Sequence, residues 1–96
     1  MDFQIGSTLW LECDVKPGPF PNERFVRIPS NGSEWLGFVS DSELKIPIVS
    51  GSTEVRSRVV WIKDDFFGAM LPGHGFGTSI YTGSISKVIE VDSLST

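Results

Sequence analysis

The sequence has 96 residues, 40% of them apolar, and carries a net charge of −4 with a single cysteine. A chain of this length forms one domain, and its apolar content excludes disorder as well as a need for metals or disulfides to complete a core. The acidic balance argues against nucleic acid and anionic membranes, because proteins that bind them carry basic patches.

Cys13 is the only cysteine, so no intrachain disulfide is possible, which fits a reducing compartment. The N-terminal residues show neither a basic region nor an apolar segment typical of a signal peptide. The longest apolar run covers residues 66–71, far short of the roughly 20 residues that a membrane-spanning helix needs. We therefore expect a cytoplasmic protein that does not enter a membrane.

The first predicted strand covers residues 9–15, where apolar and polar residues alternate with a period of two. The alternation places one set of side chains in the core, namely Leu9, Leu11, Cys13 and Val15. Trp10, Glu12 and Asp14 then share the opposite face.

Residues 16–22 contain three prolines and predict a loop, because proline removes donors from a strand ladder. Residues 23–28 predict a second strand, which a turn at Asn31-Gly32 separates from a third strand over 34–39. Alternation at Leu44, Ile46 and Ile48 predicts a short edge strand.

Residues 53–63 are rich in β-branched residues and predict a long strand with Val59 and Trp61 on one face. Asp64-Asp65 then predicts a hairpin turn into a strand over 66–71. Two short β-like segments, over residues 78–82 and 85–91, end the chain. We expect one domain over residues 1–91 with a frayed tail over 92–96.

Short strands separated by turn signals predict an all-β fold, a small barrel or compact sandwich of five to seven antiparallel strands. The C-terminal stretch over 77–91, GTSIYTGSISKVIEV, resembles the end of an SH3-like barrel, where one helical turn separates the last two strands. The proline-rich excursion lies where such barrels carry their long first loop. The resemblance is one of fold and implies no particular family or ligand.

An aromatic and acidic surface is the strongest candidate for a binding site. Trp10, Glu12 and Asp14 share the face of the first strand that is opposite to the core, and Phe20 and Pro21 follow in the adjoining loop. Exposed aromatic residues beside a proline-rich loop are typical of peptide grooves and subunit interfaces. The alternative is that Trp10 packs beneath the loop, and the sequence does not choose between the two.

The glycine-rich loop over 73–77 contains a second possible site, with His74 and Phe76. No helix is predicted after this loop, so it lacks the helix N-terminus of phosphate-binding loops, and a mobile surface loop is the favoured interpretation. His74 has neither a cysteine nor a carboxylate beside it in sequence, and Cys13 lies on a core face. We therefore expect no catalytic group, no metal and no cofactor.

Two pairs of arginines, Arg24 with Arg27 and Arg56 with Arg58, would form a cationic patch if their strands were neighbours. The favoured alternative is ordinary pairing with acidic residues across the sheet, from Glu12, Asp14, Glu23 or Glu54.

These observations predict a small non-catalytic module that contacts a protein or peptide partner. The alternative is a homo-oligomer assembled through exposed strand edges. A remote third possibility is an enzyme, because Ser79-Ile80-Tyr81 weakly resembles the Gln-Ile-Tyr segment of plasmid-type dihydrofolate reductases, although Ser79 replaces the glutamine.

Overall fold

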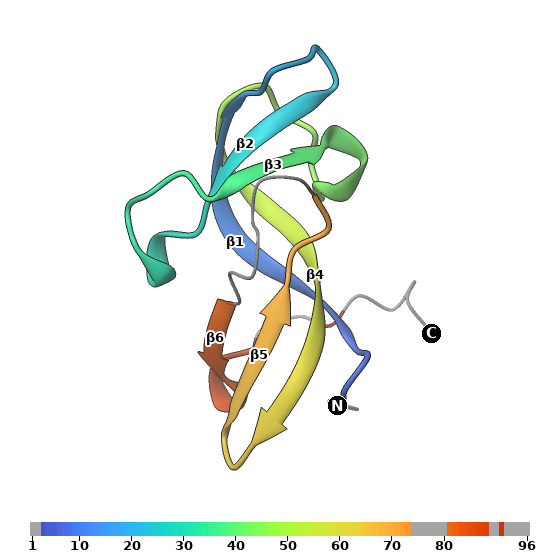
Figure 1. Cartoon of the computed structure of the whole chain (residues 1–96), viewed down its shortest axis with the longest axis vertical. Coiled ribbons are helices and arrows are strands. Elements are labelled where there is room, and N and C mark those ends of the chain that lie inside the picture. The colour runs from blue at the N-terminus through green and yellow to red at the C-terminus, as the bar shows by residue number, and fades with distance from the viewer. Residues whose placement is uncertain (1–2, 74–80, 89–90, 92–96) are drawn as a thin grey trace.

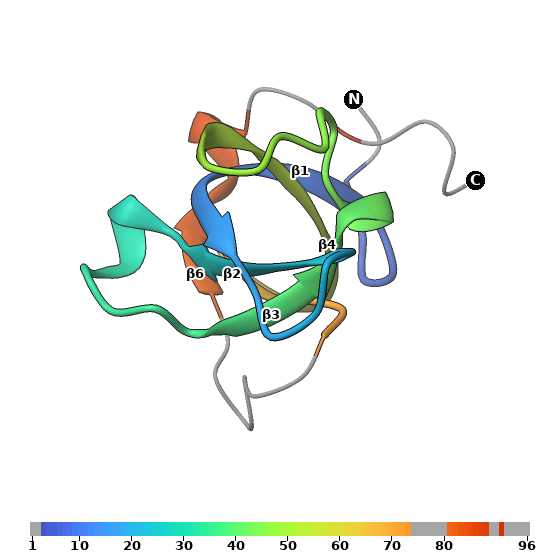
Figure 2. The same ribbon diagram turned by 90° about the horizontal axis from the view of Figure 1, so that it is seen from above.

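The computed structural model describes residues 3–73, 81–88 and 91 and forms a single antiparallel sheet (Figure 1). Its strand order is β3-β2-β1-β4-β5-β6, and the sheet curls strongly into a half-barrel (Figure 2). The predicted all-β class is confirmed. The strands are β1 (Thr8–Pro17), β2 (Glu23–Arg27), β3 (Gly37–Ser40), β4 (Gly51–Lys63), β5 (Phe66–Met70) and β6 (Tyr81–Ser84).

The described residues also form three short 3₁₀ turns: η1 (Pro29–Asn31) between β2 and β3, η2 (Asp41–Glu43) between β3 and β4, and η3 (Ile85–Lys87) after β6. Within the described ranges, no helix is long and apolar enough to cross a membrane.

The core lies on the concave side of the curled sheet. The alternation predicted for β1 is confirmed, since Leu9 and Cys13 are fully buried and Leu11 and Val15 nearly so. Phe67 is the largest side chain in this core, and Phe3 packs against it edge-on at 5.1 Å between ring centroids. Ser57 is the most buried polar residue of the described chain, and its hydroxyl donates a hydrogen bond to the carbonyl oxygen of Leu9 at 3.3 Å.

Strand β4 pairs along its length with two different neighbours. Its first part, from Gly51 to Arg58, pairs with β1, and its second part, from Arg58 to Lys63, pairs with β5. Figure 1 shows β4 running down the long axis of the molecule and ending in the β4–β5 hairpin. Both halves of the curled sheet therefore share this one strand.

The β4–β5 hairpin is confirmed, with Asp64 and Asp65 as its turn and Asp64 at a φ of 56°. The face predicted for Trp61 is wrong. A bulge between Val59 and Trp61 reverses the alternation, so Trp61 pairs with outward-facing Gly68 while Ile62 packs on the core. A β-bulge adds one residue to a strand and so shifts every later side chain to the other face.

The edge strand predicted at Leu44, Ile46 and Ile48 is wrong. Leu44 makes only an isolated bridge to Val55, although its side chain is buried. The next backbone donors have unlike partners, because Lys45 donates to the carbonyl of Glu54 while Ile46 donates to a threonine hydroxyl. Pro47 has no N–H, so a ladder does not continue.

The prediction of a β-like segment over 85–91 is wrong for its first part, because residues 85–87 form η3. The carboxylate of Asp65 accepts from the backbone N–H of Ser86 at 3.2 Å and from the hydroxyls of Ser84 and Ser86. These hydrogen bonds fasten the start of η3 to the hairpin turn. Beyond η3, Val91 forms a bridge with Leu9, and the predicted tail lies outside the described residues.

Candidate ligand-binding groove

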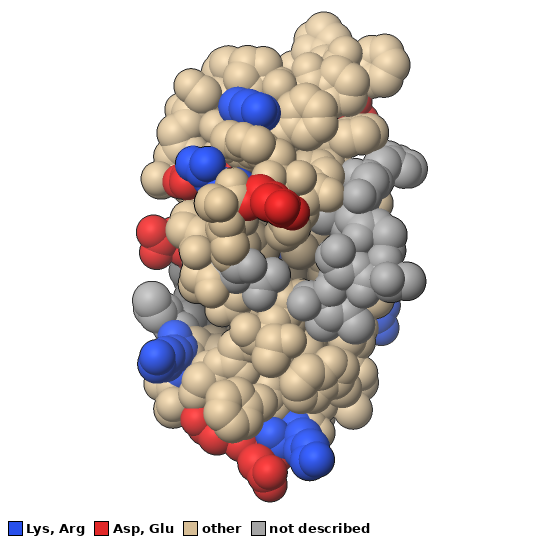
Figure 3. Space-filling view, turned by 60° about the vertical axis from the view of Figure 1, so that its left-hand side comes forward, with Lys and Arg blue, Asp and Glu red and all other residues tan. Residues whose placement is uncertain are grey.

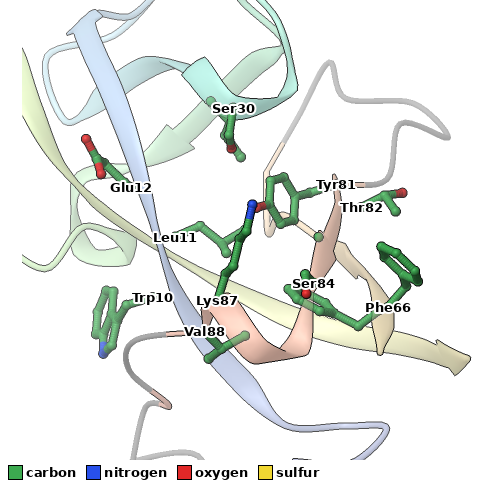
Figure 4. A pocket seen from close by; sticks show the side chains of 13 residues that line it. Trp10, Leu11, Glu12, Ser30, Phe66, Tyr81, Thr82, Ser84, Lys87 and Val88 are labelled. Atoms are coloured by element: carbon green, nitrogen blue, oxygen red, sulfur yellow. The ribbon is translucent and has the colours of Figure 1, made fainter. Parts of the chain in front are cut away.

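A cavity of about 490 Å³ opens between β1 and β6, the strands that face each other across the open side of the half-barrel. We call it the β1–β6 groove. One wall comes from Trp10, Leu11 and Glu12 of β1 with Ile28 and Ser30, and the other from β6, η3 and the start of β5. Figure 4 shows Leu11 pointing from β1 toward Tyr81, whereas Trp10 and Glu12 lie on the other side of β1.

Tyr81 forms the aromatic wall of the groove on the β6 side. Its ring lies 5.8 Å from the ring of Phe67, and a β-carbon at Gly83 would come within 2.7 Å of Tyr81 Cε1. Glycine at position 83 therefore allows the tyrosine ring to lie flat along its own strand. Phe66 is 53% exposed and also lines the groove, so an aromatic side chain is available to a ligand there.

The outer face of β1 combines Trp10 with a row of carboxylates. The guanidinium of Arg56 lies 5.0 Å from the Trp10 ring centroid, and the Lys45 ammonium lies 5.8 Å from it, so the half-buried indole packs against cations. Glu12 lies directly opposite Glu54 in the β1–β4 register. Like charges in this position repel each other.

Asp14 is electrostatically compensated, unlike Glu12. Its carboxylate accepts from Arg27 Nη2 at 3.0 Å and from the hydroxyl of Ser52 at 3.0 Å, and these two hydrogen bonds hold its pKa below the usual range. Glu54 has Lys45 at 3.8 Å. Glu12 is exposed and has no hydrogen bond or ion pair within the described part of the chain.

Cys13 lies in the core beneath these carboxylates. Burial, followed by the negative charges of Asp14, Glu54 and Glu12, raises its pKa to about 12. A thiol that stays protonated at neutral pH is a poor nucleophile, so its place in the core agrees with the packing role expected from the sequence. In the described residues, no group of three or more His, Cys, Asp or Glu side chains could hold a metal ion.

The predicted site residues are divided between two places. Trp10, Glu12 and Asp14 share the outer face of β1, and the first two also line the groove. Phe20 and Pro21 lie beyond the other end of β1, and Phe20 is 64% exposed. A strand rises about 3.3 Å per residue, so the length of β1 separates these two from Trp10. His74 and Phe76 lie outside the described residues.

A buried arginine holds the loop that contains Phe20 and Pro21. Arg24 is only 7% exposed, and its Nη1 donates to the carbonyls of Pro21 and Glu23 at 2.8 and 2.9 Å. Its Nε donates to the carbonyl of Ile48 at 2.8 Å, which connects this loop to the segment before β4.

The predicted cationic patch is absent from the described structure, because β1 lies between β2 and β4. Arg27 pairs instead with Asp14 at 3.0 Å and Arg56 with Glu43 at 3.6 Å. Asp14 is among the acidic partners predicted from the sequence, whereas Glu43 is not. Figure 3 shows a face on which basic and acidic side chains are interspersed rather than gathered by sign.

Sequence reasoning missed a second aromatic cluster. Trp35 lies between two cations, with Lys16 Nζ 4.4 Å and the Arg27 guanidinium carbon 4.6 Å from its ring. Beside it, Phe25 and Phe38 pack edge to face at 5.9 Å on β2 and β3. The sequence reasoning also missed Phe66, Tyr81 and Lys87 as groove residues, because only the curl of the sheet brings β6 toward β1.

Comparison with protein-family models finds no match, and comparisons with curated proteins and with solved structures find none either. Of Ser79-Ile80-Tyr81, only Tyr81 is described, and it packs on Phe67 in the groove wall. The case for function therefore depends on the groove itself.

Proposed function

We propose that this chain is a non-catalytic binding module that holds a protein partner in the β1–β6 groove and against the Trp10–Glu12 face of β1. The groove carries this proposal, because its volume of about 490 Å³ is combined with exposed aromatic side chains and a few polar groups. Peptide-binding sites commonly have this composition, since aromatic rings supply contact area and scattered polar groups supply orientation.

Glu12 favours a partner segment with a basic residue at the β1 wall, and Lys87 of η3 is the other charged residue among the described residues that line the groove. Glu12 and Glu54 oppose each other across β1 and β4, and Lys45 forms an ion pair with Glu54. A lysine or arginine of the partner beside Glu12 would offset this repulsion. Trp10 lies next to Glu12 along β1 and can contact the apolar part of the same side chain.

Selection from a random peptide library against the immobilised protein tests this function. We expect the enriched peptides to carry lysine or arginine and to bind Glu12→Lys about tenfold more weakly, because the charge reversal replaces an attraction with a repulsion. Glu34→Lys is the matched control, since Glu34 is also exposed and does not line the groove.

Failure to enrich any sequence would contradict the proposed function. So would equal losses of affinity in Glu12→Lys and Glu34→Lys, because a general charge effect would then explain both.

We further propose that the curled sheet is an SH3-like barrel. Two features support this proposal: β6 runs directly into the single turn η3, and Val91 beyond that turn bridges to Leu9 of the first strand. A homo-oligomer remains the second candidate function, because β3 and β6 end the described sheet and present strand edges. Light scattering at micromolar concentration distinguishes a monomeric module from such an assembly.

A further inference from the structure

The register of β5 and β6 shows which backbone groups of β6 face the groove. Ile85 donates its backbone N–H to the carbonyl of Asp65 at 2.6 Å, and the β5–β6 register continues from Phe66 opposite Ser84 to Ala69 opposite Tyr81. In an antiparallel ladder, hydrogen-bonded and non-hydrogen-bonded pairs alternate. Tyr81 and Gly83 therefore direct their backbone groups to β5, and Ile85 directs its N–H there, while Thr82 directs its N–H and C=O groups, and Ser84 its N–H, away from β5. The carbonyls of Ser84 and Ile85 belong to the turn η3.

These outward groups form an open strand edge beside the groove. Thr82 and Ser84 both line the groove, and in the described ranges no strand pairs with this edge of β6. Backbone donors and acceptors in a row attract another extended chain, because it can continue the ladder.

The groove has room for a short strand. An extended residue in a sheet occupies about 160 Å³, from a rise of about 3.3 Å, a strand spacing of about 4.8 Å and a layer thickness of about 10 Å. A volume of about 490 Å³ thus holds roughly three such residues, and β6 itself is four residues long. The number of extended residues that fit the groove is therefore close to the number of residues in β6.

We propose that a partner protein inserts an extended segment into the groove and adds it as a strand beside β6, an inference that depends on the function proposed above. Side chains of an extended segment alternate, so one can pack on Tyr81 while its neighbour points out of the groove. A basic residue of the segment meets Glu12.

The charges favour a different protein over a second copy of this chain. Each copy carries a net charge of −4, and its own edge strands β3 and β6 contain no basic residue to meet Glu12. The edge strands of a second copy would therefore bring no cation to Glu12, and the net charges of the two copies would repel each other.

The experiment removes one edge donor without disturbing the sheet. Thr82→Pro deletes an N–H that points away from β5, and proline is tolerated at such edge positions. We expect the selected peptides to bind this variant at least about tenfold more weakly. Thr82→Val is the matched control, because it keeps the N–H and the branched side chain, so the further loss in Thr82→Pro reports the N–H alone.

A second measurement decides the matter even if Thr82→Pro fails to fold. Each backbone nitrogen of a selected peptide is methylated in turn, and binding to the unmodified protein is measured. An added strand predicts losses at alternate positions only, because only every second N–H faces β6. Melting curves of both Thr82 variants show whether the sheet is intact.

Unchanged affinity in a folded Thr82→Pro, or a methylation pattern without alternation, would overturn the added strand. If the selected peptides still bind through Glu12 in that case, the proposed binding function is retained and only the added strand is contradicted. A library that yields no binders contradicts both proposals. A dimer of the parent chain that Thr82→Pro converts to a monomer would show that the occupant is a second copy, which also contradicts the proposal.

Discussion

Replacing Gly68 with alanine tests the packing at the β4 bulge. A β-carbon at this position would overlap Nε1 and Cε2 of the Trp61 indole and lie 2.7 Å from its Cδ1, so the ring must leave. A tryptophan buries about 150–250 Å², and uncovering one face exposes about 80 Å², which costs about 2 kcal/mol. Alanine regains about 0.5–1 kcal/mol over glycine in a strand. We expect a net loss of about 1–1.5 kcal/mol in the free energy of unfolding.

A double-mutant cycle in urea separates this contact from a general effect of the substitution. In a Trp61→Ala background the clash is absent, so Gly68→Ala should stabilise the protein by about 0.5–1 kcal/mol. The coupling energy between the two sites is then about 2 kcal/mol. Equal effects of Gly68→Ala in both backgrounds would refute the reasoning, because the indole would then not decide the outcome.

Three further predictions concern buried and hydrogen-bonded groups. Cys13 should react with a disulfide reagent at pH ~8 at least about tenfold more slowly in the folded protein than in urea, because burial raises its pKa to about 12; equal rates would contradict this. Hydrogen bonds from Ser84 and Ser86 lower the pKa of Asp65, so its contribution to stability is present above about pH 4 and is lost as the pH falls through the lowered value. Urea titrations in acid should show a smaller loss of stability in Asp65→Asn than in the parent protein, with Asp64→Asn as the matched control. An unchanged loss in Asp65→Asn would contradict the role of this carboxylate. Arg24→Lys should cost about 2–4 kcal/mol in urea unfolding, because one ammonium cannot replace three hydrogen bonds to carbonyls, and a parent-like midpoint would disprove the role of this side chain.

The parts of the fold that follow from local pattern could be predicted from the sequence. The alternation of β1 identified its buried residues, and Asp64-Asp65 identified the hairpin, because both signals lie within a few neighbouring residues. Trp61 was assigned to the wrong face, since a bulge depends on how two strands pair and not on one strand alone.

The candidate site was predictable only in part. The shared face of Trp10 and Glu12 follows from a period of two, but the opposing wall from Tyr81 and Thr82 depends on the curl of the whole sheet. Leu44 shows the same limit, because alternation predicted an edge strand there, while its single bridge to Val55 depends on the partners of the residues that follow it.

Strand β4 has a consequence for how the molecule unfolds. Arg58 is paired with Thr8 on one side and with Met70 on the other, so the two halves of the sheet meet in a single residue. The two ladders are separate, but side chains from both halves belong to one hydrophobic core, so we expect the chain to melt in one cooperative step. A change that pulls β4 out of register would therefore reach the hairpin and the groove together.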